Sequence, residues 1–343
     1  MNHFFKRFLR SSRLFMEPAF FVLVMVLPAG DLSPAQRASV GCVLWMGYWW
    51  ITLPVSAAVT ALVPVCINAL FHVLPMEEVI GCYFSEIVVL LLGANFISLS
   101  WEETGLDKRL AMKVLCLIGP RAEQQIVVWF LLSVALSMFL PNAVVCAILI
   151  SIAVSMLKFI FEGDVLRSPV GPLILAVTAW GAGIGGLGTP LGGAMNLIAV
   201  EYLEKLSGRE FLYADWVVRL CPVLLVLSAV NMAYFMAICP RGAALGGTKE
   251  YFVRRYRALA PMDRDEMCSL VLFAAAAGLS FARGLFAGQL PALKPAYIFL
   301  ICGMMTFFIP KRDAAPMLTW AKAEKRSSGA CCSCLRAALP RAG

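Results

Sequence analysis

Charged residues and histidines are scarce in this 343-residue chain. Only 15% of its residues are charged and 61% are hydrophobic, whereas about a quarter of the residues in a soluble domain are charged. The two histidines are His3 and His72, and no Ser/His/Asp, paired-aspartate or HExxH arrangement is visible. This scarcity argues against a histidine metal centre, and it makes an integral membrane enzyme the weakest of the function classes considered.

Long hydrophobic runs are what the chain has in excess. They recur from residue 19 to residue 309, and short basic connections separate them. The formal charge of +8 would suit a nucleic-acid partner, but this placement of Lys and Arg follows the positive-inside rule instead. We therefore expect a multi-pass protein of the cell inner (plasma) membrane, with lipid around it, a cytoplasmic N-terminus and no nucleic-acid partner.

Residues 181–196 form an uncharged, glycine-rich interruption between two apolar runs. Each glycine in a helix costs about 1 kcal/mol relative to alanine, and a proline costs about 3 kcal/mol. The sequence therefore predicts an unwound segment here. Unwound backbone at membrane depth needs protein or water to satisfy its polar groups, and in secondary transporters such breaks surround ions and anionic substrates.

Two other interpretations of this stretch stay open. Gly181-x-Gly183-x-x-Gly186 matches a dinucleotide-binding fingerprint, which requires a preceding strand and a βαβ unit; neither is visible. The second alternative is a glycine loop that allows close packing and binds no ligand.

A second interruption divides the apolar tract 126–157 at Pro141-Asn142. Each arm has about 15 residues, whereas a membrane span needs about 20. The pattern predicts a re-entrant hairpin with its tip at Pro141-Asn142, and one long kinked helix is the alternative. A further apolar run, 79–100, carries Glu86, and a carboxylate inside a span would be a candidate functional group.

Residues 105–118 show the pattern of a helix lying in the plane of the membrane surface. The apolar positions on one face are Leu106, Leu110, Val114 and Leu117. The charged positions on the other face are Asp107, Lys108, Arg109 and Lys113.

Three stretches of the chain together resemble the divalent anion/sodium symporter family, whose members move dicarboxylates, tricarboxylates or sulfate. Residues 185–196 are similar to the family's Gly-Gly-x-x-Thr-Pro-Ile-Gly-x-x-x-Asn break, and residues 105–111 are similar to its Gly-Leu-His-x-Arg-Ile-Ala amphipathic helix. Residues 318–325 look like the segment that enters its ninth helix. The resemblance implies an all-α integral membrane protein, a multi-span helical transporter that contains the first inverted repeat and the start of the second.

The expected organisation follows from this resemblance. The first repeat contains the interface helix 105–118, the re-entrant hairpin 126–157 and a broken helix 170–205. The full division is a basic segment with the first membrane helix at 1–35, the first inverted repeat at 36–240, a basic cytoplasmic linker at 241–265, the start of the second repeat at 266–325 and an aberrant tail at 326–343.

The resemblance also implies the binding residues. In the family the hairpin tip reads Ser-Asn-Thr, where this chain has Pro141, Asn142 and Ala143, so only the asparagine is retained. Sodium is the one cofactor implied, with no organic cofactor, and the full-length form is expected to be a homodimer. The expected substrate-binding residues are Asn142, Ala143, Thr189 and Pro190, and the expected sodium ligands are Asn142, Gly188, Thr189 and Asn196.

The predicted function is sodium-coupled uptake of a dicarboxylate, a tricarboxylate or another small divalent anion by an elevator-like movement. Two alternatives stay open. One is a related ion permease for sulfate, arsenite or sodium/proton exchange, and the other is a non-transporting membrane relic or scaffold.

The tail, residues 326–343, carries a separate prediction. It has no helical or strand period, and its three cysteines (Cys331, Cys332 and Cys334) lack a fourth metal ligand nearby. The codons for residues 328–334 permit a shifted frame that reads Trp-Gly-Leu-Leu-Leu-Leu, which resembles the family's continuation. We expect a truncated, frameshifted product that is inactive in transport.

Overall fold

The computed structural model describes residues 18–26, 32–161, 168, 170–240, 242–312 and 315–326. In this part of the chain the secondary structure is helical, with two isolated β-bridges and no strand. The prediction of an all-α protein is therefore confirmed. The basic residues before position 18 and the tail from position 327 lie outside the described residues. The chain forms two compact units, residues 1–88 with 324–343, and residues 89–323.

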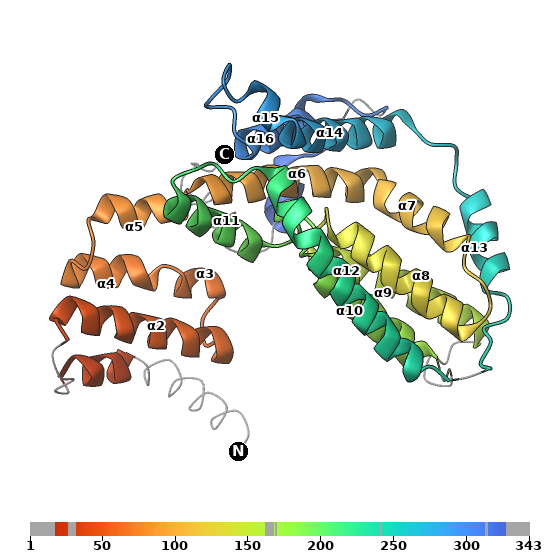
Figure 1. Cartoon of the computed structure of the whole chain (residues 1–343), viewed down its shortest axis with the longest axis horizontal. Coiled ribbons are helices and arrows are strands. Elements are labelled where there is room, and N and C mark those ends of the chain that lie inside the picture. Colours follow the sequence, from red (N-terminus) through yellow and green to blue (C-terminus); the bar gives the residue numbers. More distant parts are fainter. Residues whose placement is uncertain are drawn as a thin grey trace. The chain divides into compact units, whose positions relative to one another are not determined.

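The first unit is a stack of short apolar helices (Figure 1). The Ser33 side chain accepts a hydrogen bond from Gln36 N and so starts the second helix in a capping box. Phe21 packs on Gly41, where an added Cβ would lie 2.5 Å from its ring. The helices of this unit are a segment over 18–26, α2 (Pro34–Thr52), α3 (Ala57–Thr60), α4 (Val63–Phe71) and α5 (Met76–Tyr83).

The first half of the second unit contains both predicted interruptions (Figure 1). The first falls between α8 and α9, and the second falls between α10 and α11. The elements are α6 (Glu86–Thr104), α7 (Leu106–Leu115), α8 (Ala122–Ser137), α9 (Asn142–Ile160), α10 (Gly171–Gly185), the 3₁₀ turn η2 (Pro190–Gly192), α11 (Ala194–Ser207) and α12 (Tyr213–Ala237).

The remaining elements are α13 (Thr248–Arg257), α14 (Arg264–Phe281), α15 (Arg283–Phe286), α16 (Pro295–Phe308) and α17 (Trp320–Arg326). The helix α13 lies inside the stretch expected to be a basic linker. Sequence reasoning missed it because charge dominates its composition, and only Thr248, Tyr251 and Phe252 are buried. Those three side chains face the rest of the unit and hold the helix in place.

The glycine-rich interruption is shorter than predicted. The sequence predicts unwinding from residue 181, but α10 continues through Gly185, and α11 begins at Ala194. An added Cβ on Gly181 would lie 2.9 Å from the Phe130 carbonyl oxygen, and one on Gly185 would lie 2.3 Å from that of Val134. These glycines let α10 pack closely on α8, and that packing outweighs the helix cost of about 1 kcal/mol per glycine.

Glu86 lies at the start of a helix, and not in the interior of one as predicted. The run 79–100 is divided at Phe84 and Ser85, and Glu86 is the exposed first residue of α6. A carboxylate is favourable at a helix N-terminus because of the helix dipole. This position explains why an acid occurs in an apolar run, and the explanation does not require a role in binding.

The predicted faces of the interface helix also need correction. Asp107, expected on the polar face, is 1% exposed, whereas Leu117 is 81% exposed. One Asp107 oxygen accepts a hydrogen bond from Lys108 N, and the other has no partner. Burial raises the pKa of the Asp107 carboxyl to about 6. The helix therefore buries one acid, and it leaves apolar side chains uncovered at its C-terminal end.

Candidate functional site

The turn between α8 and α9 is the first half of the candidate site. The helix α8 ends at Ser137, and α9 begins at Asn142 directly after Pro141. Proline has no N–H group and disfavours helical backbone in the residue before it, so the sequence ends one helix and begins another here. The Asn142 side chain consequently lies at the N-terminus of α9.

Ser137 connects this turn to α10. Its hydroxyl oxygen lies 2.6 Å from the Asn142 amide oxygen and 2.6 Å from the Ala182 carbonyl oxygen. A serine hydroxyl carries one proton, so it can donate to only one of these two acceptors at a time. Two acceptor oxygens therefore share the single proton of one buried hydroxyl.

The second interruption folds directly over the first. An added Cβ on Gly186 would lie 2.8 Å from the Asn142 amide oxygen, and one on Gly188 would lie 2.5 Å from the Met138 side chain. The turn also closes on itself, because a Cβ on Gly192 would lie 2.3 Å from the Gly186 carbonyl oxygen. The approach of Gly192 to the Gly186 backbone allows only glycine, whereas at Gly186 and Gly188 the Asn142 and Met138 side chains would have to shift for a larger residue. The two interruptions therefore meet.

Hydrogen bonds hold the second interruption in shape. The Thr189 hydroxyl donates to the Met138 carbonyl oxygen, and Thr189 is buried. The Asn196 amide nitrogen donates to the carbonyl oxygens of Gly186, at 2.7 Å, and Thr189, at 2.9 Å. Asn196 thus closes the loop between α10 and α11 from the first turn of α11.

The structure brings most of the predicted site residues together. Asn142 contacts Gly186, and Gly188 contacts the Met138 side chain. Thr189 and Asn196 form hydrogen bonds within the same meeting point. Pro190 is buried at the start of η2. Ala143 is exposed, and its side chain has no polar atom to offer. The nitrogen of Asn196, rather than its oxygen, faces the two carbonyls.

Ser137 is the site residue that sequence reasoning missed. It is fully buried and lies five positions before Asn142, in the last turn of an apolar helix. A serine four positions before Pro141, in an apolar run that also contains Ser133, was the available signal. It gave no sign that the hydroxyl reaches α10, because that contact joins residues 45 positions apart.

The start of α12 forms another wall of the site. The Trp216 indole N–H donates to the Leu187 carbonyl oxygen at 3.0 Å. Tyr213 is buried beside Thr189 and Leu191, and its ring packs on Phe281 of α14 at 4.8 Å. The interruption is thus held by α12, which in turn packs on α14.

An ion pair between a buried arginine and an exposed glutamate lies at the same junction. Arg283 is 2% exposed, and its Nε lies 3.0 Å from a carboxylate oxygen of Glu210, in the loop before α12. Its two terminal nitrogens donate to the carbonyl oxygens of Leu290 and Pro291, each at 2.8 Å. A buried charge with this many partners is fully satisfied, and it ties the loop before α12 to the loop after α15.

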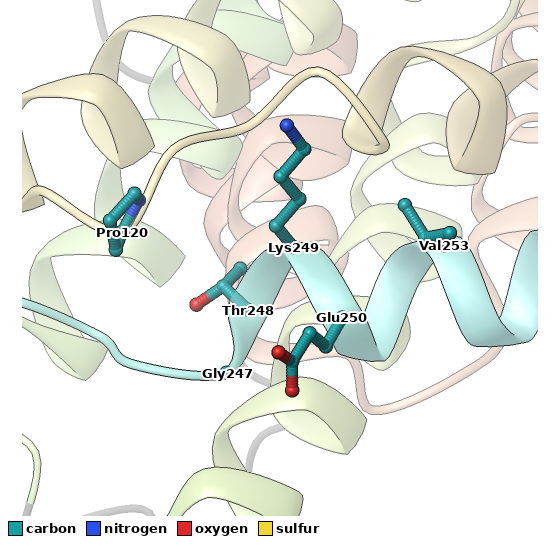
Figure 2. A pocket seen from close by; sticks show the side chains of 6 residues that line it. All are labelled: Pro120, Gly247, Thr248, Lys249, Glu250 and Val253. Atoms are coloured by element: carbon teal, nitrogen blue, oxygen red, sulfur yellow. The ribbon is translucent and has the colours of Figure 1, made fainter.

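A hollow of about 400 Å³ lies elsewhere in this unit, at the start of α13 (Figure 2). It contains none of the residues of the two interruptions, and the Thr248 hydroxyl already donates to the Leu245 carbonyl oxygen. Among the described residues, no group of three or more His, Cys, Asp or Glu side chains is placed to hold a metal ion. Any cation held at the two interruptions would need serine, amide and carbonyl oxygens, which suit a hard ion.

Apolar helices interrupted at two places that meet define a helical membrane transporter. Three helical stretches of the described part are long and apolar enough to cross a membrane: 76–104, which contains α5 and α6, then α9, and α12. The chain belongs to the citrate transporter family, CitMHS, whose model matches residues 47–324. This is a family of multi-pass transporters rather than of enzymes, and it agrees with the resemblance to divalent anion/sodium symporters.

Curated relatives point the same way. The chain is 28% identical over 280 residues to the sodium-dependent dicarboxylate transporter SdcS of Staphylococcus saprophyticus, with 79% of this chain and 54% of the relative covered. It is 25% identical over 313 residues to SdcS of Staphylococcus aureus strain NCTC 8325, with 88% and 60% covered. The chain thus spans between half and two thirds of the length of these relatives.

Proposed function

We propose that this protein binds a small dicarboxylate or tricarboxylate together with sodium where the two interruptions meet, and that it acts in secondary active uptake across the plasma membrane. The single observation that carries this proposal is the oxygen cluster of Ser137, Asn142 and Ala182. The names of the relatives, sodium-dependent dicarboxylate transporters, support the substrate and the coupling ion.

Sodium suits this oxygen cluster for an electrostatic reason. Two acceptor oxygens stand 2.6 Å from one hydroxyl oxygen that has a single proton, so one short oxygen–oxygen contact is repulsive. A hard cation coordinated by all three oxygens removes that repulsion. Rotating the Asn142 amide would also remove the repulsion, because the amide nitrogen would then face Ser137. The dependence of substrate binding on sodium distinguishes a bound cation from a rotated amide.

The ligands of this proposed cation site differ from those expected from the sequence. Asn142 remains a ligand, Ser137 and the Ala182 carbonyl join it, and Asn196 becomes a brace for the loop because its nitrogen faces the carbonyls. Ligation by Gly188 and Thr189 stays a prediction. No organic cofactor enters the proposal.

Two helix N-termini support an anion site next to the cation. The helices α9 and α11 begin at Asn142 and Ala194, on either side of the meeting point. Backbone N–H groups and the helix dipole favour negative charge at such ends. The carboxylates of the substrate would lie there, beside Ala143, Thr189 and Pro190, and the adjacent sodium would offset their charge.

Several further features belong to the same proposal. The pair α8 and α9 enters and leaves on the cytoplasmic face as a re-entrant hairpin, which its first arm of 16 residues supports. The second arm, α9, has 19 residues instead of the expected number of about 15 and is long enough to cross a membrane. Residues 36–240 and 266–325 belong to two inverted repeats, the N-terminus is cytoplasmic, and the full-length protein is a homodimer.

Binding of succinate to the purified chain tests the proposal. Trp216 donates to the backbone of the interruption, so its fluorescence is a local probe once the other seven of the eight tryptophans are replaced by phenylalanine. We expect succinate to change the fluorescence in sodium chloride and not in choline chloride, and Asn142→Ala to abolish the response. A response of equal size without sodium would contradict the coupling, and no response to succinate, citrate or another divalent anion would contradict the function.

A further inference from the structure

Two short helices lie together at the end of the α8–α9 pair that is opposite the candidate site. The loop after α7 leads directly into α8, and α13 packs on α7 (Figure 1). On α13, the Phe252 ring lies 6.2 Å from Trp129 of α8, and the Tyr251 ring lies 5.1 Å from Phe159 of α9. Along α8, Trp129 lies about 12 Å from the helix end at Ser137, and along α9, Phe159 lies about 25 Å from Asn142.

The outer surface of these two helices is strongly basic. Arg109 does not contribute free charge, because it is paired with Glu266 at 2.8 Å. The helices α7 and α13 are described throughout, and Glu250 is the one exposed acid on them. Their exposed cations are Lys108, Lys113, Lys249, Arg254, Arg255 and Arg257.

The geometry of α13 keeps its charges directed outward. Figure 2 shows Lys249 extending from the helix on the side opposite to Glu250, so this acid does not cover the lysine. The Arg255 guanidinium lies over the Tyr251 ring at 5.2 Å, a cation–π contact that fixes the side chain beside the buried face. The basic surface is therefore a built feature of the helix rather than a loose run of charge.

Exposed apolar side chains follow α7 and α13 in the chain or contact α13. Leu117 follows α7, and Phe159 at the end of α9 is 57% exposed. Leu259 and Met262, which follow α13, are also exposed. A soluble acidic partner or a nucleic acid would leave these side chains in water. Basic residues with exposed apolar side chains nearby are typical of a helix lying in the headgroup layer of a membrane.

We infer that α7 and α13 form one binding surface for anionic phospholipid headgroups. The six exposed cations pair with headgroup phosphates, and the nearby exposed apolar side chains enter the acyl region. Since Tyr251 and Phe252 attach α13 to α8 and α9, lipid bound on the outer surface holds the base of the helix pair that carries Asn142 at its other end. This surface does not depend on the substrate or the coupling ion proposed above.

The test measures binding of phosphatidylglycerol by the full chain in detergent, with phosphatidylcholine as the zwitterionic comparison. The variant combines Lys249→Gln, Arg254→Gln and Arg257→Gln, which spares the Arg255 stack. The matched control combines Lys205→Gln, Arg209→Gln and Arg219→Gln, three exposed cations on or between α11 and α12. The charge change is the same in both.

We expect the variant to bind phosphatidylglycerol roughly ten-fold or more weakly than the wild type, because each basic residue near an anionic membrane surface strengthens attachment several-fold. The control should bind like the wild type. Wild-type binding should also weaken as sodium chloride rises from about 0.1 M to 0.5 M, because salt screens exposed charges. Phosphatidylcholine and inorganic phosphate should bind no better to the wild type than to the variant.

Three results would overturn the inference: equal phosphatidylglycerol binding by wild type and variant, an equal loss in the control, or binding that does not change with salt. A fall in the melting temperature of the variant in phosphatidylcholine would indicate misfolding. In that case the salt dependence of the wild type decides. Succinate binding is measured separately, so that failure of the lipid surface and failure of the proposed transport function are distinguishable.

Discussion

The hydroxyl oxygen of Ser137 lies 2.6 Å from the amide oxygen of Asn142, across the turn between α8 and α9. The same hydroxyl reaches Ala182 on α10, so one side chain joins the two interrupted segments. Gly186 lies against the Asn142 amide from the other side. The site is thus closed by contacts between segments that are far apart in the sequence.

Gly185 and Gly183 provide a matched pair for the packing of α10. An added Cβ on Gly185 would overlap the Val134 backbone, whereas nothing lies within 4 Å of one on Gly183. We expect Gly185→Ala to destabilise the protein by about 1–3 kcal/mol, as overpacking does. Gly183→Ala should be neutral or stabilise by up to about 1 kcal/mol. Melting temperatures in detergent check both, and equal effects would contradict the close approach of α10 to α8.

Asn196 closes the loop between α10 and α11, and its removal should be costly. Asn196→Ala leaves the buried carbonyl oxygens of Gly186 and Thr189 without this donor, at a cost of about 1–3 kcal/mol. We expect a melting temperature several degrees lower in buffer without sodium. A variant that melts like the wild type would show that the loop holds its shape without this brace.

Asp107 makes stability depend on pH in an unusual direction. Burial raises the pKa of its carboxyl to about 6 in the folded protein, from 3.8, although Lys108 lowers it. The folded state therefore binds the proton more tightly, and this contribution is present below about pH 4 and is lost as the pH rises through 6. Asp107→Asn should raise the melting temperature at pH 8 and raise it much less at pH 4.5. An equal gain at both values would exclude the carboxyl as the cause.

The membrane topology of the α8–α9 pair can be checked by labelling. Glu123→Cys and Ile160→Cys place thiols at the start of α8 and the end of α9, in a background with the other cysteines replaced. If the pair is re-entrant, a membrane-impermeant reagent should reach both thiols from the cytoplasmic side. Labelling from opposite sides would mean that the pair crosses the membrane once.

Composition and periodicity predicted the helical class, because hydrophobic runs of this length have few other uses. The resemblance identified the family. Local rules misplaced the start of the second interruption. Helix propensity assigns Gly181 and Gly185 to an unwound segment, but both are needed for contact with α8. Propensity carries no information on that contact, which joins residues about 50 positions apart.

The residues that meet at the two interruptions were predicted only where a motif carried them. Asn142, Thr189 and Asn196 stand in recognisable patterns, and the structure brings them to one place. Ser137 stands in no pattern, and its role depends on two distances that the sequence does not contain. The burial of Asp107 was missed for a related reason, since a helical wheel assigns acids to the solvent side.

Succinate affinity at increasing sodium concentration, in the wild type and in Ser137→Ala, tests the oxygen cluster most directly. Ser151→Ala is the matched control, because Ser151 is exposed and its hydroxyl donates only within its own helix. We predict that sodium strengthens succinate binding in the wild type and in the control, and that Ser137→Ala loses roughly ten-fold or more of this effect, as expected when one of three oxygen ligands is removed. Sodium dependence that is unchanged in Ser137→Ala would contradict a cation site at Ser137, Asn142 and Ala182.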